Sequence, residues 1–408
     1  MRILQLCLRA PYPPADGGTI AMYNMAKSLK KAEASVKILA FNTKKHFVDP
    51  AAIPEHVTAD FNPEFVYLDA SVKPLPAFLN LLGGSSYNVS RFNTQLFRET
   101  LEQLLDREEF DVVQMESLFM TPYLNTIRKK TKAKIVLRSH NVEFLIWQRL
   151  AASEKNSIRK WYLQLLSERL KKYEQEIVNK FDGIIALTEE DKQLYRQLGC
   201  TVPLKVSPIG LDTETYTVNY NAPLTIVHLG SMDWLPNIEG VEWFLDNVYA
   251  NFIQRHPKSE VFLAGKSMPE KIYKLASENL HIEGRIDDAK KYLSDKQIMI
   301  VPLLSGGGMR VKIIEGMAMG KTIISTAIGA EGIHYENNKN ILIADSAEAF
   351  LEAISKCIAN PNHAVSIGRE ARKLAETIYE NKIVGSGIIE FYDMLKKGNN
   401  QPVDSQHA

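Results

Sequence analysis

The stretch IMIVPLLSGGGMRVKIIEGMAMGKTIISTA, residues 298–327, shows the pattern that decides the fold. The run IMIVPL is almost entirely apolar and predicts a buried strand. A loop, SGGG, comes next and is followed by MRVKIIEGMAM, in which Met309, Ile313 and Met317 recur every four residues, as on one face of a helix. The run TIISTA then predicts another strand. A strand, a loop, a helix and a second strand make a βαβ unit, the building block of a parallel sheet.

The same alternation of short apolar runs and longer helical patterns extends along the chain. In the first half, strands are expected at 2–8, 35–41, 65–68, 111–116, 134–139 and 183–187. In the second half, they are expected at 224–230, 260–265, 280–284, 298–303, 322–327 and 341–344. Helices are expected at 17–32, 158–181, 238–255 and 310–319, with a last helical region at 347–396. Pro208 and Gly210 break the alternation at 206–216, so we predict an α/β protein with two doubly wound, Rossmann-like domains.

Composition narrows the class of protein. The apolar fraction of 45% and the charged fraction of 24% are typical of a soluble globular chain, and a net charge of +1 argues against a nucleic-acid partner. The three cysteines, Cys7, Cys200 and Cys357, form no Cys-x-x-Cys pair, which argues against a zinc site and favours a reducing compartment. No apolar run reaches the roughly 18 residues of a membrane span. We therefore expect a cytoplasmic protein.

Ligands of doubly wound sheets bind at the loops that follow the carboxyl ends of the strands. In the first half, PPADGGT (13–19) places Gly17 and Gly18 at a helix start, where backbone N–H groups favour an anion. The alternative is a plain glycine turn. RSHNVEF (138–144) places His140 directly after a strand, where it can share a proton with a hydroxyl group near neutral pH. The alternative is a histidine bonded within its own loop.

Two strand-end loops of the second half offer weaker candidates. HLGSMDWLPN (228–237) contains Ser231, Asp233 and Trp234, which can contact a ligand or can close the loop by an Asx-turn and packing. IEGRID (282–287) contains Arg285, which can border a slot the size of a nucleobase or can be a solvated arginine. The sequence leaves both pairs of alternatives open.

The opening stretch holds the strongest candidate site. Gly306–Gly308 lie where a strand-to-helix loop binds anions. Arg310 and Lys312 are expected in the first turn of the helix, where positive charge opposes the helix dipole unless an anion is bound. Glu315 can pair with Lys312 on one helix face or can accept hydrogen bonds from two sugar hydroxyls. We therefore predict a phosphate site at this end of the stretch.

The Gly-Lys-Thr at 320–322 is not expected to bind phosphate. A Walker loop needs its first glycine at 315, which is Glu315, and it leads from a strand into a helix rather than the reverse. Gly320 is expected to end the helix instead. The chain also lacks Asp-x-Asp, a common metal–diphosphate clamp, and lacks G-x-G-x-x-G after the first strand, which argues against a dinucleotide dehydrogenase. We therefore expect arginine, lysine and helix N-termini, rather than a metal, to neutralise a diphosphate.

Taken in order, several pieces resemble the retaining glycosyltransferases of family 4, which have the GT-B architecture. These pieces are Gly17-Gly18, HNVE (140–143), FDGIIALTEED (181–191), PIGLD (208–212), LGSMDWLPN (229–237) and GGGMRVKIIEGMAMGKTIIST (306–326). The resemblance implies two Rossmann-like domains facing each other across a cleft. It implies an acceptor-binding domain at 1–205, a nucleotide-sugar-binding domain at 206–377, a helix at about 378–396 that packs back on the first domain, and a disordered tail at 397–408.

The resemblance also implies roles for single residues. His140 would lie beside the transferred sugar, Arg310 and Lys312 would stabilise the departing diphosphate, and Glu315 would hold the ribose hydroxyls. Gly18 would touch the donor diphosphate from the first domain, and Arg285 would lie near the nucleobase. The full set of donor-binding residues would be Gly17, Gly18, Ser231, Arg285, Gly307, Gly308, Met309 and Glu315.

Two positions depart from the family pattern. The first glutamate of the family's paired-glutamate motif falls at Gly307, and the Arg and Lys that many members carry after the first strand of the second domain are replaced by Ser231 and Asp233. Arg310 and Lys312 can substitute for that lost charge. A nucleotide-sugar 2-epimerase of the same fold and a catalytically inactive sugar-nucleotide-binding protein therefore remain as alternatives.

The function that the resemblance implies is transfer of a sugar from a nucleoside diphosphate sugar to an acceptor hydroxyl, with retention and without a metal or other cofactor. The acceptor would be a surface glycan or a lipid-linked sugar. A peripheral contact with the inner face of the membrane has two candidate segments, the apolar PLPAFLNLL (74–82) and the basic RKKTKAK (128–134). The alternative for both segments is core packing and a solvated loop.

Overall fold

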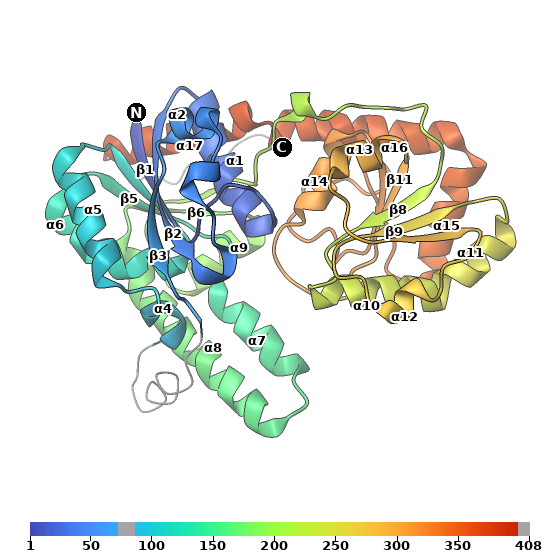
Figure 1. Cartoon of the computed structure of the whole chain (residues 1–408), viewed down its shortest axis with the longest axis horizontal. Coiled ribbons are helices and arrows are strands. Elements are labelled where there is room, and N and C mark those ends of the chain that lie inside the picture. The colour runs from blue at the N-terminus through green and yellow to red at the C-terminus, as the bar shows by residue number, and fades with distance from the viewer. Residues whose placement is uncertain (72–85, 399–408) are drawn as a thin grey trace. The chain divides into compact units, whose positions relative to one another are not determined.

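The computed structural model describes residues 1–71 and 86–398, and the chain divides into two compact units (Figure 1). The first unit is Met1–Gly210 together with Asn381–Ala408, and the second is Leu211–Glu380. The expected boundaries at 205 and 377 lie within a few residues of these divisions. The segment 74–82 and most of the tail 397–408 lie outside the described residues.

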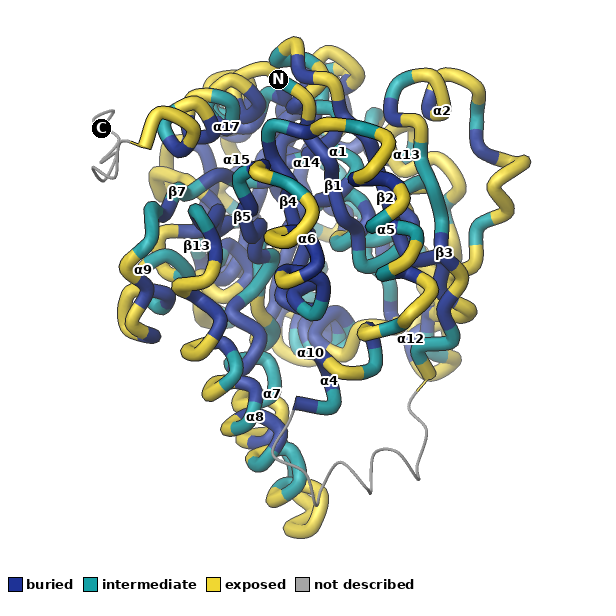
Figure 2. Tube along the Cα trace, turned by 90° about the vertical axis from the view of Figure 1, so that its left-hand side faces the viewer, coloured by how far each residue is buried: buried dark blue, intermediate teal, exposed yellow. Residues whose placement is uncertain are grey.

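The first unit contains a seven-stranded parallel sheet with the order β3-β2-β1-β4-β5-β6-β7. Its strands are β1 Arg2–Cys7, β2 Ser35–Thr43, β3 Glu64–Leu68, β4 Val112–Glu116, β5 Lys134–Arg138, β6 Gly183–Ala186 and β7 Leu204–Val206. The central strands are buried, as Figure 2 shows for β1, β4 and β5, because helices cover a parallel sheet on both faces. This burial explains why these strands appear in the sequence as continuous apolar runs.

Nine described α-helices belong to the first unit. They are α1 Gly17–Lys31, α2 Glu55–Phe61, α4 Tyr87–Ser90, α5 Gln95–Arg107, α6 Leu124–Lys130, α7 Glu143–Ser153, α8 Ser157–Ile177, α9 Glu189–Gln197 and α17 Asn381–Lys396. The expected helix at 158–181 is α8, but the sequence did not predict α7, which pairs with α8 as a hairpin (Figures 1 and 2). The Glu174 carboxylate of α8 accepts the N–H groups of Glu143 and Phe144 at 3.1 and 3.0 Å and so caps α7.

The last helix of the chain, α17, packs against α1 in the first unit. The two helices approach closely because α17 has a glycine, Gly385, at the crossing point. A Cβ atom on Gly385 would lie 1.9 Å from the carbonyl oxygen of Ser28. Beside this crossing, the Ser28 hydroxyl donates to Asn381 Oδ1 at 2.8 Å.

The second unit contains a six-stranded parallel sheet with the order β10-β9-β8-β11-β12-β13. Its strands are β8 Ile226–Leu229, β9 Val261–Ala264, β10 Leu280–Glu283, β11 Ile298–Val301, β12 Thr322–Ser325 and β13 Leu342–Ile343. Its helices are α10 Leu235–Phe244, α11 Ala250–Arg255, α12 Glu270–Tyr273, α13 Ala289–Ser294, α14 Val311–Ala318, α15 Ala347–Ala359 and α16 Pro361–Leu374. Two parallel, Rossmann-like sheets confirm the predicted fold class.

Helix boundaries in the second unit differ from the expectation in two places. The single helix expected at 238–255 is α10 and α11 joined by a π-helical turn, Leu245–Tyr249, and a second such turn, Ala375–Tyr379, follows α16. Arg310 is the N-cap residue of α14 with extended backbone, so its expected place in the first helical turn is wrong. Met309 also precedes the helix. Apolar spacing alone does not distinguish the last loop residues from the first helical ones.

Gly320 ends α14 as predicted. It has a left-handed backbone with φ of 67°, the N–H of Lys321 bonds to the Gly316 carbonyl at 2.9 Å, and the N–H of Gly320 bonds to the Met317 carbonyl at 2.9 Å. This pair of bonds is the Schellman motif, which satisfies the last carbonyls of a helix. Lys321 is completely buried, so the Gly-Lys-Thr is a helix end and not a phosphate loop.

Two glycines of α17 form a matched pair for testing the packing of this helix. Gly385→Ala should lower the free energy of unfolding by roughly 1–3 kcal/mol, because its Cβ meets the Ser28 backbone. Gly387→Ala should be neutral or stabilising by up to about 1 kcal/mol, because its Cβ would meet only Lys205 Cε at 3.5 Å and alanine favours helix. Urea unfolding of both variants measures the difference, and equal effects would contradict the packing of α17 on α1.

Candidate functional site

The candidate residues of the second unit lie at one edge of its sheet, in the loops after the strands or, for Lys312 and Glu315, in α14. Because β10, β9, β8 and β11 are neighbours and parallel, the loops that follow them lie side by side at the carboxyl edge. The loops after β8 and β9 approach so closely that a Cβ on Gly265 would lie 1.8 Å from the Gly230 carbonyl oxygen. Ser231 follows β8 and the loop at 305–310 follows the neighbouring strand β11, so both lie at this edge.

The loop after β11 has a backbone that suits glycine. Gly306 and Gly308 have φ of 108° and 80°, in the left-handed region. This backbone allows the Arg310 side chain to fold back and donate to the carbonyls of Gly307 and Gly308. Arg310 is only 5% exposed, and its guanidinium carbon lies 5.1 Å from the Trp234 ring centre. The loop thus holds a desolvated cation directly before the N-terminus of α14.

Lys312 connects α14 to the loop after β8. Its Nζ donates to Asn237 Oδ1 at 2.9 Å, and Asn237 Nδ2 donates to the Ser231 carbonyl at 2.7 Å. A Cβ on Gly230 would lie 2.7 Å from this Nζ, so a larger residue there would displace the Lys312 side chain. Burial and the charge of Arg310 lower the pKa of Lys312 to about 7, although Glu315 opposes the shift. Two cations close together are a site that favours an anion.

Glu315 bonds to Tyr216, and the pairing with Lys312, one of the two alternatives that the sequence left open, is not formed. The Tyr216 hydroxyl donates to Glu315 Oε1 at 3.0 Å. Burial raises the pKa of Glu315, and the Tyr216 hydrogen bond and the charges of Lys290 and Lys312 oppose the rise. The carboxylate thus accepts one hydroxyl donor of the protein itself, and its role toward sugar hydroxyls stays a prediction.

Two further side chains lie along the same edge. Arg285 follows β10, with 80% of its side chain exposed and its Nε 3.5 Å from Asp287 Oδ1. Lys266 follows β9 and pairs with Asp233 at 3.0 Å. The sequence analysis missed Lys266, although it occupies a glycine-containing loop directly after a buried strand. Lys266 supplies positive charge to the loop in which the family's usual Arg and Lys are absent.

In the first unit, His140 belongs to a buried ionic cluster. The registers of β4 and β5 place Glu116 opposite Arg138. Arg138 Nη1 donates to Glu116 Oε2 at 2.9 Å, and His140 Nε2 lies 2.6 Å from the same oxygen. Glu116 and Arg138 are completely buried, whereas the His140 side chain is 15% exposed. Glu116 therefore holds the imidazole in place at the edge of the sheet.

The carboxylate of Glu116 is ionised by its surroundings. Burial alone would raise its pKa, but the Arg138 charge and the hydrogen bonds from His140 and Gln5 lower the pKa of Glu116 to about 2. Gln5 Nε2 donates to Oε1 at 2.7 Å, and the Gln114 amide donates to the same oxygen. A carboxylate with these partners stays charged at neutral pH.

The cluster extends to the last helix of the chain. The Tyr392 hydroxyl of α17 donates to Gln114 Oε1, and both side chains are completely buried. The sequence analysis missed Gln5, Gln114 and Glu116, although each is a polar residue inside a buried strand. Such residues are expected to have partners. The polar residues within the apolar runs RILQLCL and DVVQME could therefore have indicated this cluster.

Gly17 and Gly18 begin α1, but an internal carboxylate occupies this helix start. Asp16 Oδ1 accepts the N–H groups of Gly18 and Thr19 at 3.0 and 3.1 Å, as an N-cap. Arg9 donates to both oxygens of Asp16, at 2.7 Å to Oδ2. An external anion at Gly18 would therefore compete with Asp16.

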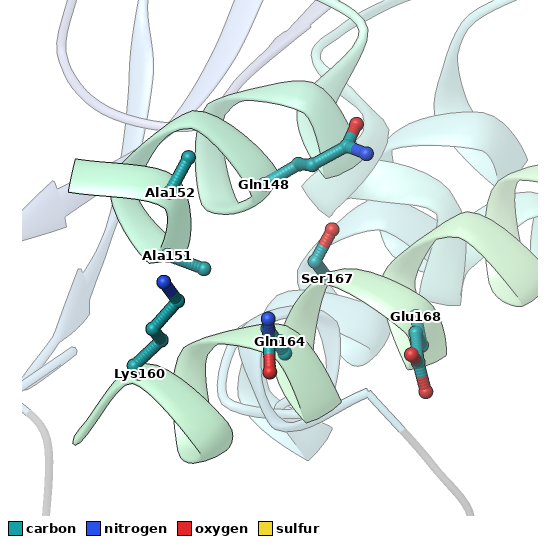
Figure 3. Close-up of a pocket in the computed structure, with 7 residues that line it drawn as sticks. All are labelled: Gln148, Ala151, Ala152, Lys160, Gln164, Ser167 and Glu168. Atoms are coloured by element: carbon teal, nitrogen blue, oxygen red, sulfur yellow. The ribbon is translucent and has the colours of Figure 1, made fainter. Parts of the chain in front are cut away.

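A hollow of about 530 Å³ lies between α7 and α8 (Figure 3). Its lining residues are Gln148, Ala151, Ala152, Lys160, Gln164, Ser167 and Glu168. None of them is a candidate site residue. Within residues 1–71 and 86–398, no three His, Cys, Asp or Glu side chains gather as metal ligands would. The described helices include none that is long and apolar enough to cross a membrane.

Comparison with protein families gives two matches. Residues 15–215 match the model described as Glycosyltransferase Family 4, and residues 223–360 match the model described as Glycosyl transferases group 1. Together with the fold, these matches assign the chain to the glycosyltransferases of the GT-B type.

Individual proteins and solved structures are also similar to this chain. An uncharacterised 44.6 kDa protein in the cps region of Klebsiella pneumoniae is 23% identical over 309 residues, which cover 72% of this chain and 77% of the relative. The HepE protein of Anabaena in complex with UDP is similar in structure, with a TM-score of 0.65, 13% identity, and coverage of 96% and 100% of the two chains. Sucrose-phosphate synthase from Thermosynechococcus elongatus has a TM-score of 0.69, 17% identity, and coverage of 98% and 100%.

Two glutamates of the first unit test how much the buried cluster contributes. Glu116→Ala should lower the free energy of unfolding by roughly 3–5 kcal/mol, because Arg138 is left as an uncompensated buried charge. Glu108→Ala, which breaks a surface pair with Arg2 at 2.9 Å, should cost less than about 1 kcal/mol. Denaturant unfolding gives both values. A Glu116→Ala protein as stable as the Glu108→Ala protein would show that the cluster does not hold His140 in place.

Proposed function

We propose that this protein is a retaining glycosyltransferase that moves a sugar from a nucleoside diphosphate sugar to an acceptor hydroxyl without a metal ion. The observation that carries the proposal is the group formed by Arg310, Lys312 and Glu315 at the carboxyl edge of the second sheet. Arg310, which donates to two glycine carbonyls, lies directly before α14. Lys312, whose pKa is lowered, lies in the first turn of α14. A diphosphate placed there would satisfy both cations and the helix N-terminus together.

In this proposal, the second unit binds the donor. Arg310 and Lys312 stabilise the negative charge that develops on the diphosphate as the sugar departs. Glu315 accepts hydrogen bonds from the ribose hydroxyls, which replace the hydroxyl of Tyr216. Ser231 and the backbone of Gly307, Gly308 and Met309 border the diphosphate, and Arg285 lies on the side of the nucleobase. Anabaena HepE, which is similar in fold, has been solved in complex with UDP and with UDP-glucose, which supports a nucleotide donor.

The first unit, in this proposal, binds the acceptor and orients the sugar. His140 is held by Glu116 and presents its exposed edge to the sugar hydroxyls, without acting as a nucleophile. The N–H of Gly18 becomes available to an external anion only if the Asp16 cap opens. The family resemblance favours attack of the acceptor hydroxyl on the sugar from the same face from which the diphosphate departs. The leaving phosphate oxygen would then take the acceptor proton.

A surface polysaccharide, or a lipid-linked precursor of one, is the proposed acceptor, and the similar protein from a cps region supports this choice. We propose a cytoplasmic protein with a peripheral membrane contact. The basic segment 128–134 gives that contact little support, because Arg128 pairs with Asp182 at 2.6 Å and Lys130 with Asp106 at 2.7 Å. These ion pairs favour the alternative of a solvated surface, although the segment is the end of α6 and the start of β5 rather than one loop.

Arg310→Ala tests the proposal directly. Release of nucleoside diphosphate from a panel of UDP-, GDP- and ADP-sugars should fall by about a hundredfold or more, because a preorganised donor to the leaving group is lost. Arg255→Ala, an exposed arginine of the same unit, should leave the rate unchanged. Circular dichroism of both variants checks the fold, and Arg310→Lys keeps the charge if the alanine variant does not fold. A wild-type rate in the folded Arg310→Ala variant would overturn the assignment, and loss of activity in chelator would overturn the metal-free mechanism.

The pKa of Lys312 predicts how donor binding depends on pH. The free protein loses the Lys312 proton as the pH rises through about 7, whereas a bound diphosphate would hold that proton. UDP should therefore bind more weakly as the pH rises from 7 to 9. The phosphates of UDP do not change their charge in this range, because their last pKa is about 6. Lys312→Arg, which stays charged, should remove this dependence. Calorimetric titration at several pH values measures it, and a wild-type affinity that does not change would place the diphosphate elsewhere.

A further inference from the structure

A basic pocket in the first unit is not used by the donor site described above. It has a volume of about 690 Å³, within the range of small-molecule sites, and lies over the carboxyl ends of β1, β2 and β3. Arg9 follows β1, Lys44 and Lys45 follow β2, and Asp69 follows β3. Arg91, the C-cap residue of α4, lines another side. Leu8, Ala70 and Phe92 add apolar surface to the lining.

The lining of the pocket has more cationic than anionic side chains. Four of its lining residues are cationic, Arg9, Lys44, Lys45 and Arg91, and only Asp69 is anionic. Asp69 Oδ2 lies 3.5 Å from Lys44 Nζ, a weak pairing, and Arg9 is bound by Asp16. Over residues 1–71 and 86–398, no carboxylate lies within ion-pair distance of Lys45 or Arg91. Two cations thus border the same hollow without an anionic partner.

Arg91 is the more unusual of these two cations. Its Nε is buried and has no hydrogen-bond partner in the part of the chain that the structure describes. The guanidinium carbon lies 4.9 Å from the Phe92 ring centre, and burial lowers the pKa of Arg91. A buried guanidinium N–H without a partner costs free energy unless a ligand accepts its hydrogen bond. Arginine at such a position suits a phosphate or a carboxylate.

We propose that this pocket binds an anionic group of the acceptor, a phosphate or a carboxylate, through Lys45 and Arg91. The acceptor is then an acidic or phosphorylated sugar rather than a neutral one. Apolar residues beside the two cations contact the sugar ring that carries the anion. This inference rests on the proposed function, because it assigns the pocket to the acceptor of the same transfer reaction.

Three small probes separate the possible sources of the anion. Glucose 1-phosphate carries a phosphate, glucuronate carries a carboxylate, and methyl glucoside is neutral. Each is titrated by calorimetry into protein saturated with UDP, so that the donor site is filled. Binding of glucose 1-phosphate alone assigns a phosphate, and binding of glucuronate assigns a carboxylate. Methyl glucoside should not bind measurably.

The variants compare equal changes in charge at two places in the first unit. Lys45→Gln with Arg91→Gln should weaken binding of the anionic probe at least tenfold, because two charge-assisted hydrogen bonds are lost. Lys129→Gln with Lys132→Gln, an exposed pair away from the pocket, should leave the affinity unchanged. Lys45 is exposed, and Lys45→Gln alone should weaken binding at least threefold. This single variant tests the proposal if Arg91→Gln impairs folding.

Equal affinity in the pocket variants and the wild type would overturn the proposal. Equal weakening by the Lys129 and Lys132 variants would do the same, since it would indicate attraction to the overall charge. UDP binding by each variant is measured first and should be unchanged. A wild-type protein that does not bind UDP contradicts the proposed function, whereas one that binds UDP but no anionic sugar contradicts only the assignment of the pocket.

Discussion

Both sheets of this protein are entirely parallel, and this constraint places every strand-to-helix loop of a sheet along one edge. In the second unit, the constraint brings together residues that are far apart in the sequence. Lys312 of α14 meets Asn237 of α10 only because β8 and β11 are neighbours with their carboxyl ends at the same edge. The Gly230 backbone must lie against Lys312 for this bond to form, and any larger residue would displace it. The proposed donor site is therefore a consequence of strand order and of the absence of side chains at the strand ends.

The two units use ionic groups in different ways. In the first unit, the charges of Glu116 and Arg138 satisfy each other in the core, and the cluster fixes the position of His140. In the second unit, Arg310 and Lys312 have the same sign, and their mutual repulsion is part of what lowers the pKa of Lys312. A site with unbalanced positive charge gains more from binding an anion than a balanced site does. The first arrangement is suited to holding a side chain, and the second to holding a ligand.

Much of the fold was predictable, because apolar runs and helical spacing report burial directly. The sequence identified most strands and the end of α14 at Gly320, whose left-handed backbone is a local property. It did not predict β7 or α7, because elements that are short or only partly buried give weak periodic signals. It placed Arg310 one position too far into the helix, since spacing does not report where a side chain folds back onto its own loop.

The sequence predicted which loops carry the candidate site residues, but not which residues contact them. A histidine after a strand and cations after a glycine loop can be seen in the sequence. The pairing of Glu116 with Arg138 depends on the register of two strands, and the contact of Tyr392 with Gln114 joins residues 278 positions apart. Tyr216 likewise reaches Glu315 across 99 positions of sequence. Long-range contacts of this kind follow from the fold and have no local signature.

The measurement that tests the account most directly is a crystal structure of the protein with UDP. Both phosphates should lie within hydrogen-bonding distance of the Arg310 guanidinium and Lys312 Nζ, with the ribose hydroxyls on Glu315. Tyr216 should give up its hydrogen bond to Glu315. A nucleotide bound at another edge of either sheet, with Arg310 and Lys312 making no contact to phosphate, would contradict the central claim.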